Sequence, residues 1–231
     1  MQMGDFAVIA HRGASGSYPE NTLLAFREAL AAGARWLELD VHLSADRQLL
    51  VIHDAHLQRT TSGHGRVGQY PFTELRQLDA GLGEPIPLLE EVLDLASGRA
   101  GVNIELKGRE TGKAVAALLR KRTSGGKADQ VLVSSFNMDE LRQLSAQLPR
   151  IAVGLLAEKV DQQLWRFVEE LQPWSLHLRS DCVDRQLVGE AHRRGLKLLA
   201  YTVNDPRQLQ QLKDVGVDGV FTDFPERFVR L

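Results

Sequence analysis

A strand pattern followed by a helix pattern recurs along nearly the whole chain, and this alternation limits the possible folds more than any other feature. Apolar runs that predict strands lie near residues 6, 37, 103, 132, 153, 176, 199 and 220. The predicted helices cover residues 21–34, 89–96, 110–122, 138–148, 162–171, 185–194, 206–215 and 225–230. Eight such units in 231 residues predict an α/β fold of the TIM (β/α)8 barrel type. We expect a single barrel domain over residues 1–231.

One further apolar run, at residues 49–53, does not fit this alternation. It follows the second strand after only a few residues, whereas a parallel crossover needs about a dozen or more. We therefore expect an antiparallel hairpin that brings His53 back to the level of Glu38 and Asp40. Residues 44–87 are rich in glycine and proline, which predicts a small insertion between strand two and helix two.

Composition excludes several classes of partner and location. A formal net charge of −2 gives no bulk attraction to nucleic acid or to anionic membranes, so we expect a small-molecule substrate and no stable membrane association. The lone cysteine, Cys182, cannot form an internal disulfide and suits a reducing compartment. Neither a leader pattern nor a membrane-length apolar run is visible, which predicts a cytoplasmic protein. The sequence does not indicate an oligomeric state.

Acidic side chains alternate with apolar ones on two of the predicted strands. Glu38 and Asp40 lie on the second strand, and Glu105 lies on the third. Because alternate residues of a strand share a face, all three carboxylates should point into the barrel. Oxygen ligands of this kind suit Mg²⁺, Ca²⁺ or Mn²⁺, whereas Zn²⁺ favours histidine or cysteine. We predict one divalent cation at this cluster. In the alternative, a basic side chain would neutralise each carboxylate, but Arg12 and Lys107 are too few to neutralise three acids.

Two histidines close predicted strands that face this acidic cluster. His11 follows the first strand, and His53 follows the hairpin strand. Histidine titrates near neutral pH, so such a pair can accept and donate a proton in one turnover. Arg12 and Lys107 supply the positive charge that phosphate oxygens bind. The set suits a phosphodiester substrate, although chemistry alone does not identify it.

Three neighbouring polar residues receive other roles. Asn21 is expected to cap the first helix, because asparagine is a favoured residue at helix starts. His42 shares strand parity with Glu38 and Asp40, but it is expected to point outward over the rim. His177 is interpreted as structural unless it lines the barrel mouth.

Ten short motifs occur in order across the chain. They are HRG at 11–13, PENT at 19–22, ELDV at 38–41, HD at 53–54, RTTSG at 59–63, IPLLEE at 86–91, NIELK at 103–107, SF at 135–136, YTVN at 201–204 and GVDGVFTD at 216–223. The ordered set resembles the glycerophosphodiester phosphodiesterase family, in its bacterial cytoplasmic form. Tyr201 departs from the family pattern, which usually has tryptophan there.

This resemblance implies a TIM barrel with a small insertion after strand two. It also implies metal-dependent hydrolysis of glycerophosphodiesters, which are deacylated phospholipids, to glycerol 3-phosphate and an alcohol. The cofactor would be Mg²⁺ or Ca²⁺. By resemblance, the matching positions are His11 and His53 as base and acid, Glu38, Asp40 and Glu105 as metal ligands, and Arg12, Lys107, Glu20, Phe136 and Tyr201 as substrate-binding residues.

Three rival functions can be weighed against this one. A lysophospholipase D-like activity on lipids with one acyl chain is disfavoured, because no apolar insertion or anchor is evident. A non-catalytic barrel that binds glycerophosphodiesters would be supported by loss of a proton-transfer histidine, yet His11 and His53 are both present. A zinc amidohydrolase would carry a His-x-His pair at the end of strand one, where this chain has His-Arg-Gly.

Overall fold

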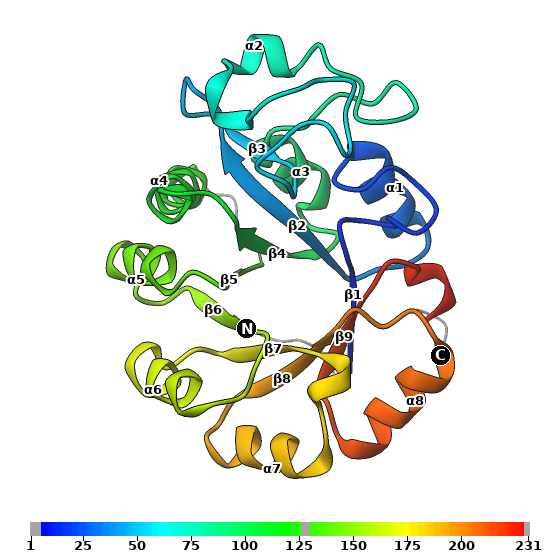
Figure 1. The fold of residues 1–231 in the computed structure, drawn as a ribbon, viewed down its shortest axis with the longest axis vertical. Coiled ribbons are helices and arrows are strands. Elements are labelled where there is room, and N and C mark those ends of the chain that lie inside the picture. Colours follow the sequence, from blue (N-terminus) through cyan, green and yellow to red (C-terminus); the bar gives the residue numbers. More distant parts are fainter. Residues whose placement is uncertain (1–5, 126–129, 229–231) are drawn as a thin grey trace.

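The strands form a closed parallel barrel with one extra antiparallel strand (Figure 1). The computed structural model describes residues 6–125 and 130–228. Its strands are β1 (Ala7–Ala10), β2 (Trp36–Leu43), β3 (Leu49–Val51), β4 (Gly101–Leu106), β5 (Val131–Ser135), β6 (Ala152–Ala157), β7 (Ser175–Arg179), β8 (Lys197–Tyr201) and β9 (Gly219–Thr222). The barrel closes because β1 pairs in parallel with both β9 and β2. The predicted TIM barrel is confirmed.

Helices cover the outside of this barrel, as Figure 1 shows for α4 to α8. The barrel helices are α1 (Leu23–Ala31), α3 (Leu89–Ala96), α4 (Thr111–Ser124), α5 (Met138–Gln147), α6 (Gln162–Leu171), α7 (Arg185–Arg193) and α8 (Pro206–Val215). Shorter segments are α2 (Phe72–Leu75), η1 (Val67–Gln69), η2 (Ser180–Cys182) and η3 (Pro225–Arg227). Within the described ranges, none of the helices has the length and apolar character needed to cross a membrane.

Side chains that cap helix starts explain several element boundaries. Asp161, Asp184 and Asp205 accept hydrogen bonds from backbone N–H groups at the first turns of α6, α7 and α8. Such caps satisfy donors that the helix itself leaves unpaired. The first helix is shorter than predicted, because its cap is Thr22 and not Asn21. The side chain of Asn21 takes no part in this cap.

The barrel interior is filled by side chains below the mouth. Leu132, Leu199 and Phe221 belong to one buried apolar cluster in this interior. His177 is fully buried and its ring lies 5.0 Å from the ring of Phe221. Its Nε2 lies 2.8 Å from Ser175 Oγ, and burial lowers the pKa of His177 to about 3. His177 is therefore a neutral structural residue and does not line an open mouth.

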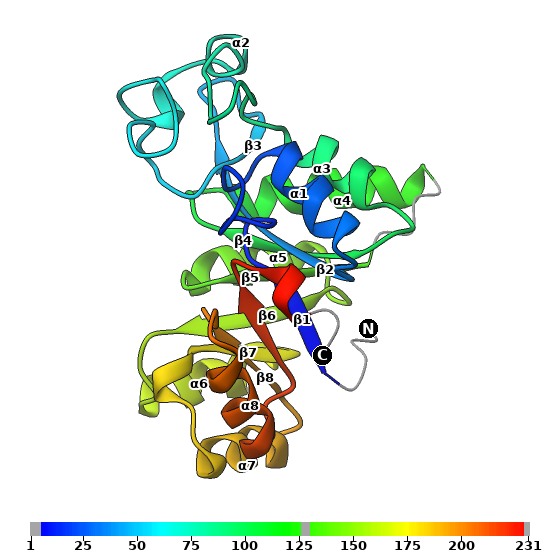
Figure 2. The same cartoon turned by 90° about the vertical axis from the view of Figure 1, so that its right-hand side faces the viewer.

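The insertion, residues 44–87, begins as the predicted hairpin and then leaves the barrel. β3 pairs antiparallel with β2, with Val51 opposite Val41. The backbone N–H of Ile52 donates to the carbonyl of Asp40 at 3.0 Å, so the chain enters the site directly after β3. Figure 2 shows the insertion projecting beyond the barrel. It contributes a separate apolar cluster, formed by Leu50, Ile52, Leu57, Val67, Leu75 and Ile86.

The surroundings of two glycines, one facing the barrel interior and one in an outer helix, predict opposite effects of substitution by alanine. A Cβ at Gly154 would lie 2.5 Å from His177 Nε2, so Gly154→Ala should lower the free energy of unfolding by about 1–3 kcal/mol through overpacking. Gly189 lies inside α7, and a Cβ there would come no closer than 3.5 Å to its nearest neighbour. Gly189→Ala should therefore raise stability by about 0.5–1 kcal/mol. Urea unfolding measures both, and a stabilising Gly154→Ala would contradict this description of the interior.

Candidate active site

Three buried carboxylates converge at the carboxyl ends of β2 and β4. Glu38 and Asp40 point inward from β2, and Asp40 is paired in register with Glu105 of β4. These side chains belong to residues only 2%, 1% and 8% exposed, in that order. Each offers one oxygen atom, and these oxygens lie within 4.8 Å of one another. The strand alternation that predicted this acidic cluster is therefore realised.

The charge of the acidic cluster is only partly compensated. Glu38 Oε1 and Asp40 Oδ1 are buried and accept no hydrogen bond from the described part of the chain. Burial, together with Asp40 and Glu105, raises the pKa of Glu38 well above its usual value. Burial and the charge of Asp40 also raise the pKa of Glu105. Buried carboxylate oxygens that accept no hydrogen bond from the described residues fit a divalent cation such as Mg²⁺, Ca²⁺ or Mn²⁺.

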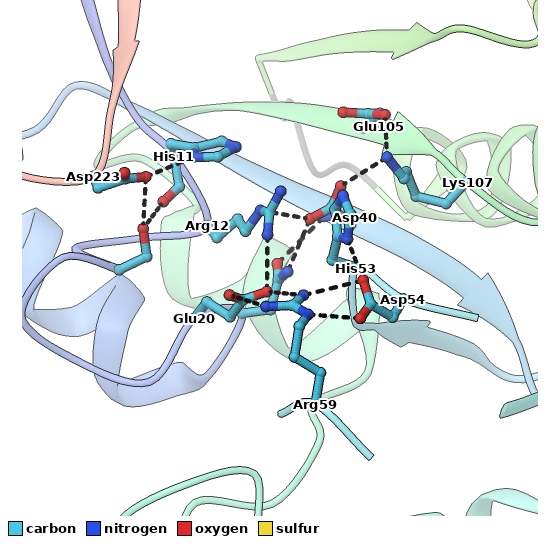
Figure 3. A network of polar contacts seen from close by, with 12 residues as sticks. His11, Arg12, Glu20, Asp40, His53, Asp54, Arg59, Glu105, Lys107 and Asp223 are labelled. Atoms are coloured by element: carbon cyan, nitrogen blue, oxygen red, sulfur yellow. Dashed lines mark hydrogen bonds and ion pairs between the residues drawn. The ribbon is translucent and has the colours of Figure 1, made fainter. Parts of the chain in front are cut away.

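Arg12 and Lys107 contact this cluster from two sides (Figure 3). The backbone N–H of Arg12 donates to Glu38 Oε2 at 2.8 Å, and its Nε lies 3.3 Å from Asp40 Oδ2. Lys107 Nζ donates to Glu105 Oε1 at 2.8 Å and lies 3.9 Å from Asp40 Oδ1. Burial opposes the charge of Asp40, but Arg12, His53 and Lys107 outweigh it and hold the pKa of Asp40 below its usual value. Both cations therefore lie where an anionic substrate would meet them.

His11 is held by a carboxylate that the sequence did not reveal. Its Nδ1 lies 2.6 Å from Asp223 Oδ1, just beyond the end of β9. An ionised carboxylate only accepts hydrogen bonds, so Nδ1 carries a proton and Nε2 is left for chemistry. Asp223 also accepts from Ser15 Oγ at 3.1 Å and from Asn204 Nδ2 at 2.6 Å. Burial alone would raise the pKa of Asp223. The hydrogen bonds from His11, Asn204 and Ser15 outweigh this effect and lower the pKa to about 2.

His53 is held in a similar way by its neighbour in sequence. Its Nδ1 lies 2.6 Å from Asp54 Oδ1, which again fixes the proton on Nδ1. Burial lowers the pKa of His53, and the nearby Arg12 contributes to this. The prediction that His42 points out over the rim is wrong. His42 is only 9% exposed, and its Nε2 lies 2.9 Å from the carbonyl oxygen of His53. The hairpin covers β2 at this point, which buries His42.

Asn21 is a site residue and does not cap α1. Its Nδ2 donates to Asp40 Oδ2 at 2.9 Å, and the backbone N–H of Asp40 donates to Asn21 Oδ1 at 3.3 Å. The residue has a left-handed backbone, with φ of 59°, and is 3% exposed. Asparagine tolerates this conformation better than most residues. Asn21 therefore fixes the orientation of the central carboxylate.

The remaining predicted residues lie around the mouth. The rings of Phe136 and Tyr201 are 6.2 Å apart at 85°, in edge-to-face geometry. Lys107 Nζ lies 5.7 Å from the ring of Phe136, and Tyr201 Oη donates to the carbonyl of Ala157 at 3.2 Å. Glu20 Oε1 accepts from Arg12 Nη1 at 2.9 Å. The structure thus brings every predicted site residue to one end of the barrel.

Comparison with known proteins places this arrangement in a family. The model of the glycerophosphoryl diester phosphodiesterase family matches residues 11–227. The chain belongs to the glycerophosphoryl diester phosphodiesterase family. A relative from Caldanaerobacter subterraneus, named glycerophosphodiester phosphodiesterase, is 36% identical over 97% of this chain and 96% of its own. A relative of the same name from Bacillus altitudinis is also 36% identical, over 97% of each chain.

Solved structures of this family share the fold. The structure of an Oleispira antarctica phosphodiesterase in complex with the product sn-glycerol-3-phosphate has a TM-score of 0.89 and 36% identity, and covers 96% of this chain and 94% of that one. A glycerophosphodiester phosphodiesterase from Agrobacterium tumefaciens has a TM-score of 0.84 and 29% identity, and covers 98% and 100%. Membership of the family makes this chain an enzyme of the phosphoric diester hydrolase class.

The charge imbalance in the acidic cluster predicts how Glu38→Gln alters stability without divalent cations. The raised pKa of Glu38 means that, above the ordinary glutamate pKa of 4.5, the unfolded chain loses this proton more readily than the folded one. Wild-type stability therefore falls as pH rises through this range, and glutamine removes that loss. Denaturation in EDTA should show Glu38→Gln more stable than wild type at pH 8, with the advantage disappearing below about pH 4.

Divalent cations should reverse this order. A cation that binds only the folded state stabilises it by mass action, so wild type should gain stability in millimolar Mg²⁺ or Ca²⁺. Glu38→Gln should gain less, because one anionic ligand is lost. A wild type that is already the more stable protein in EDTA at pH 8 would contradict the charge imbalance described above.

Proposed function

We propose that the protein hydrolyses glycerophosphodiesters to glycerol 3-phosphate and an alcohol, with a divalent cation as cofactor. The observation that carries this proposal is the convergence of an acidic triad, two cations and two histidines whose Nδ1 atoms are held by carboxylates at one end of the barrel. Family membership and the product-bound Oleispira relative support the same substrate class. The substrate is then a small molecule, and no nucleic acid takes part.

Glu38, Asp40 and Glu105 would hold the cation, since their oxygens are clustered and incompletely partnered. When bound, the cation would offset their excess negative charge and polarise a phosphoryl oxygen. The donor set suits Mg²⁺ or Ca²⁺, with Mn²⁺ as a third choice. Metal dependence is thus a consequence of the buried carboxylates.

Arg12 and Lys107 would bind the phosphate. Burial opposes the charge of Arg12, but Asp40, Glu38 and Glu20 outweigh it and raise the pKa of the guanidinium. Arg12 therefore remains a permanent cation, and Lys107 adds a second charge on the opposite side of Asp40. Cations fixed in a partly buried site stabilise the charge that develops on phosphoryl oxygens during displacement.

The two histidines would transfer the protons. We assign His11 as the base that takes a proton from the nucleophile and His53 as the acid that gives one to the departing alkoxide. Burial lowers the pKa of His53, so its protonated form is a stronger acid than an ordinary imidazolium. Attack by water yields the products directly, whereas attack by the glycerol 2-hydroxyl yields a cyclic phosphate that water then opens. Both routes cleave the bond between phosphorus and the alcohol oxygen.

Phe136 and Tyr201 would contact the organic part of the substrate. Their edge-to-face pair forms an aromatic wall next to Lys107, and Phe136 is 43% exposed. An exposed aromatic ring beside the phosphate site is suited to packing against glycerol or the alcohol.

The cytoplasmic location, like the lack of stable membrane association, remains a prediction.

A lysophospholipase D-like reaction is the second candidate. The observation in its favour is a mouse relative named lysophospholipase D GDPD1, 27% identical over 95% of this chain and 83% of its own. The same bond would be cleaved in a substrate that keeps one acyl chain. A non-catalytic binding barrel is a weaker candidate, because both histidines have the proton placement that acid–base chemistry needs.

The activity itself should be visible as glycerol 3-phosphate released from glycerophosphocholine in Mg²⁺ or Ca²⁺. Chelation should abolish it, and His11→Ala and His53→Ala should each lower kcat by about 10²- to 10⁴-fold. His64→Ala, an exposed histidine in the insertion, is the control and should keep wild-type kcat. Lysophosphatidylcholine in the same assay decides between the two substrate classes. Full activity in chelator would contradict the role of the cation.

Asp223→Asn should impair His11 without unfolding the protein. An asparagine can donate as well as accept, so the imidazole loses its fixed proton and orientation, and kcat should fall by about 10²-fold. Because the pKa of Asp223 is about 2, the loss should be equal at pH 6 and pH 8. Asp218→Asn is the matched control, since Asp218 contacts His192 at 2.9 Å before β9 begins. Equal losses in both variants would contradict a specific role for Asp223.

A further inference from the structure

The two catalytic histidines have similar carboxylate partners but different supports behind them. Asp223, the partner of His11, is held by Ser15 and Asn204, which belong to the barrel. Asp54, the partner of His53, is held by Arg59, which belongs to the insertion. His53 therefore depends on a side chain that the barrel does not supply.

Arg59 binds two carboxylates at once (Figure 3). Its Nε donates to Asp54 Oδ2 at 2.6 Å and its Nη2 to Asp54 Oδ1 at 3.1 Å. Its Nη1 and Nη2 donate to Glu20 Oε2 and Oε1, each at 2.8 Å. A planar guanidinium can serve two carboxylates in this way, whereas a lysine offers only a point charge.

These contacts connect the two halves of the site. Glu20 also accepts from Arg12, and Asp54 also holds His53, so a continuous path runs Arg12–Glu20–Arg59–Asp54–His53. Arg59 is the central member of this path and joins its two carboxylates, Glu20 and Asp54. Removing it would leave two neighbouring carboxylates without their common cation.

We propose that Arg59 is a positioning residue, which sets the orientation of His53 through Asp54 and that of Arg12 through Glu20. The insertion thereby controls both proton transfer and phosphate binding, although it contributes neither metal ligand nor phosphate ligand. This inference rests on the proposed function. It deepens that function by assigning a task to the RTTSG segment at 59–63.

Burial indicates that this role is separable from stability. The Arg59 side chain is 46% exposed and lies outside the apolar cluster of the insertion. Exposed ion pairs contribute little to stability, so its removal should cost activity far more than folding. Arg76 offers a matched control, because it forms a two-point ion pair with Glu91 at 2.5 and 2.8 Å from the same insertion.

Steady-state kinetics on glycerophosphocholine in Mg²⁺ should compare Arg59→Ala, Arg59→Lys and Arg76→Ala with wild type. Arg59→Ala should lower kcat by about 10- to 100-fold and raise KM, since both His53 and Arg12 lose support. Arg59→Lys should recover only a small part of the lost kcat, because an ammonium cannot form both two-point ion pairs, with Asp54 and with Glu20. Millimolar guanidinium should restore part of the kcat of Arg59→Ala and leave Arg76→Ala unchanged.

A double variant tests the path itself. If Arg59 acts through Asp54, the fall in kcat for Asp54→Asn with Arg59→Ala should be smaller than the product of the two single effects. Melting temperatures of all variants show that each is folded. A folded Arg59→Ala protein with wild-type kcat and KM would overturn the proposal, as would a loss matched by Arg76→Ala.

A spectroscopic readout separates this proposal from the proposed function. The hydrogen-bonded Nδ1 proton of His53 should give a downfield NMR signal that weakens or shifts in Arg59→Ala and persists in Arg76→Ala. A wild-type protein that hydrolyses no glycerophosphodiester contradicts the proposed function, and this signal then decides the role of Arg59 alone. An unchanged signal in Arg59→Ala contradicts the positioning role even if the enzyme is active.

Discussion

The mutual repulsion of three buried carboxylates is the constraint on which the rest of the site depends. Glu38, Asp40 and Glu105 lie close together where solvent cannot screen their charge. Burial of unpaired charge is costly, so the fold must supply compensation nearby. It does so with a backbone N–H of Arg12, the side chain of Asn21 and the ammonium of Lys107. The negative charge that these groups do not compensate remains available to bind a cation. Arg12 and Lys107 in turn remain available to bind an anionic substrate.

Barrel closure supplies the second condition for catalysis. β1 and β9 are distant in sequence but paired in space, which brings Asp223 to His11. On the other side of the mouth, β3 returns along β2 and delivers His53 beside Asp40. The histidines are thus held by separate elements, with Arg12 between them in Figure 3. Such placement allows one to serve the entering group and the other the leaving group.

The sequence predicted what depends on local periodicity and missed what depends on pairing. Alternation on two strands was enough to predict that the acids point inward, and the short link after β2 was enough to predict the hairpin. Asp223 was missed because its role requires the pairing of β1 with β9, although its place one residue past a strand end was a usable signal. Asn21 was misassigned because a polar residue before a helix looks like a cap. Loop conformation places Arg59, and strand or helix periodicity carries no information about it.

The insertion has an apolar core of its own and touches the barrel chemistry through a few polar side chains. Its length and sequence can therefore change without repacking the barrel interior, provided that the strand on β2, His53, Asp54 and Arg59 are kept. This separation makes the rest of residues 44–87 the segment in which evolution, or an engineer, can most readily change the surroundings of the site. A new covering segment could admit a different alcohol while the barrel keeps the same phosphate chemistry beneath it.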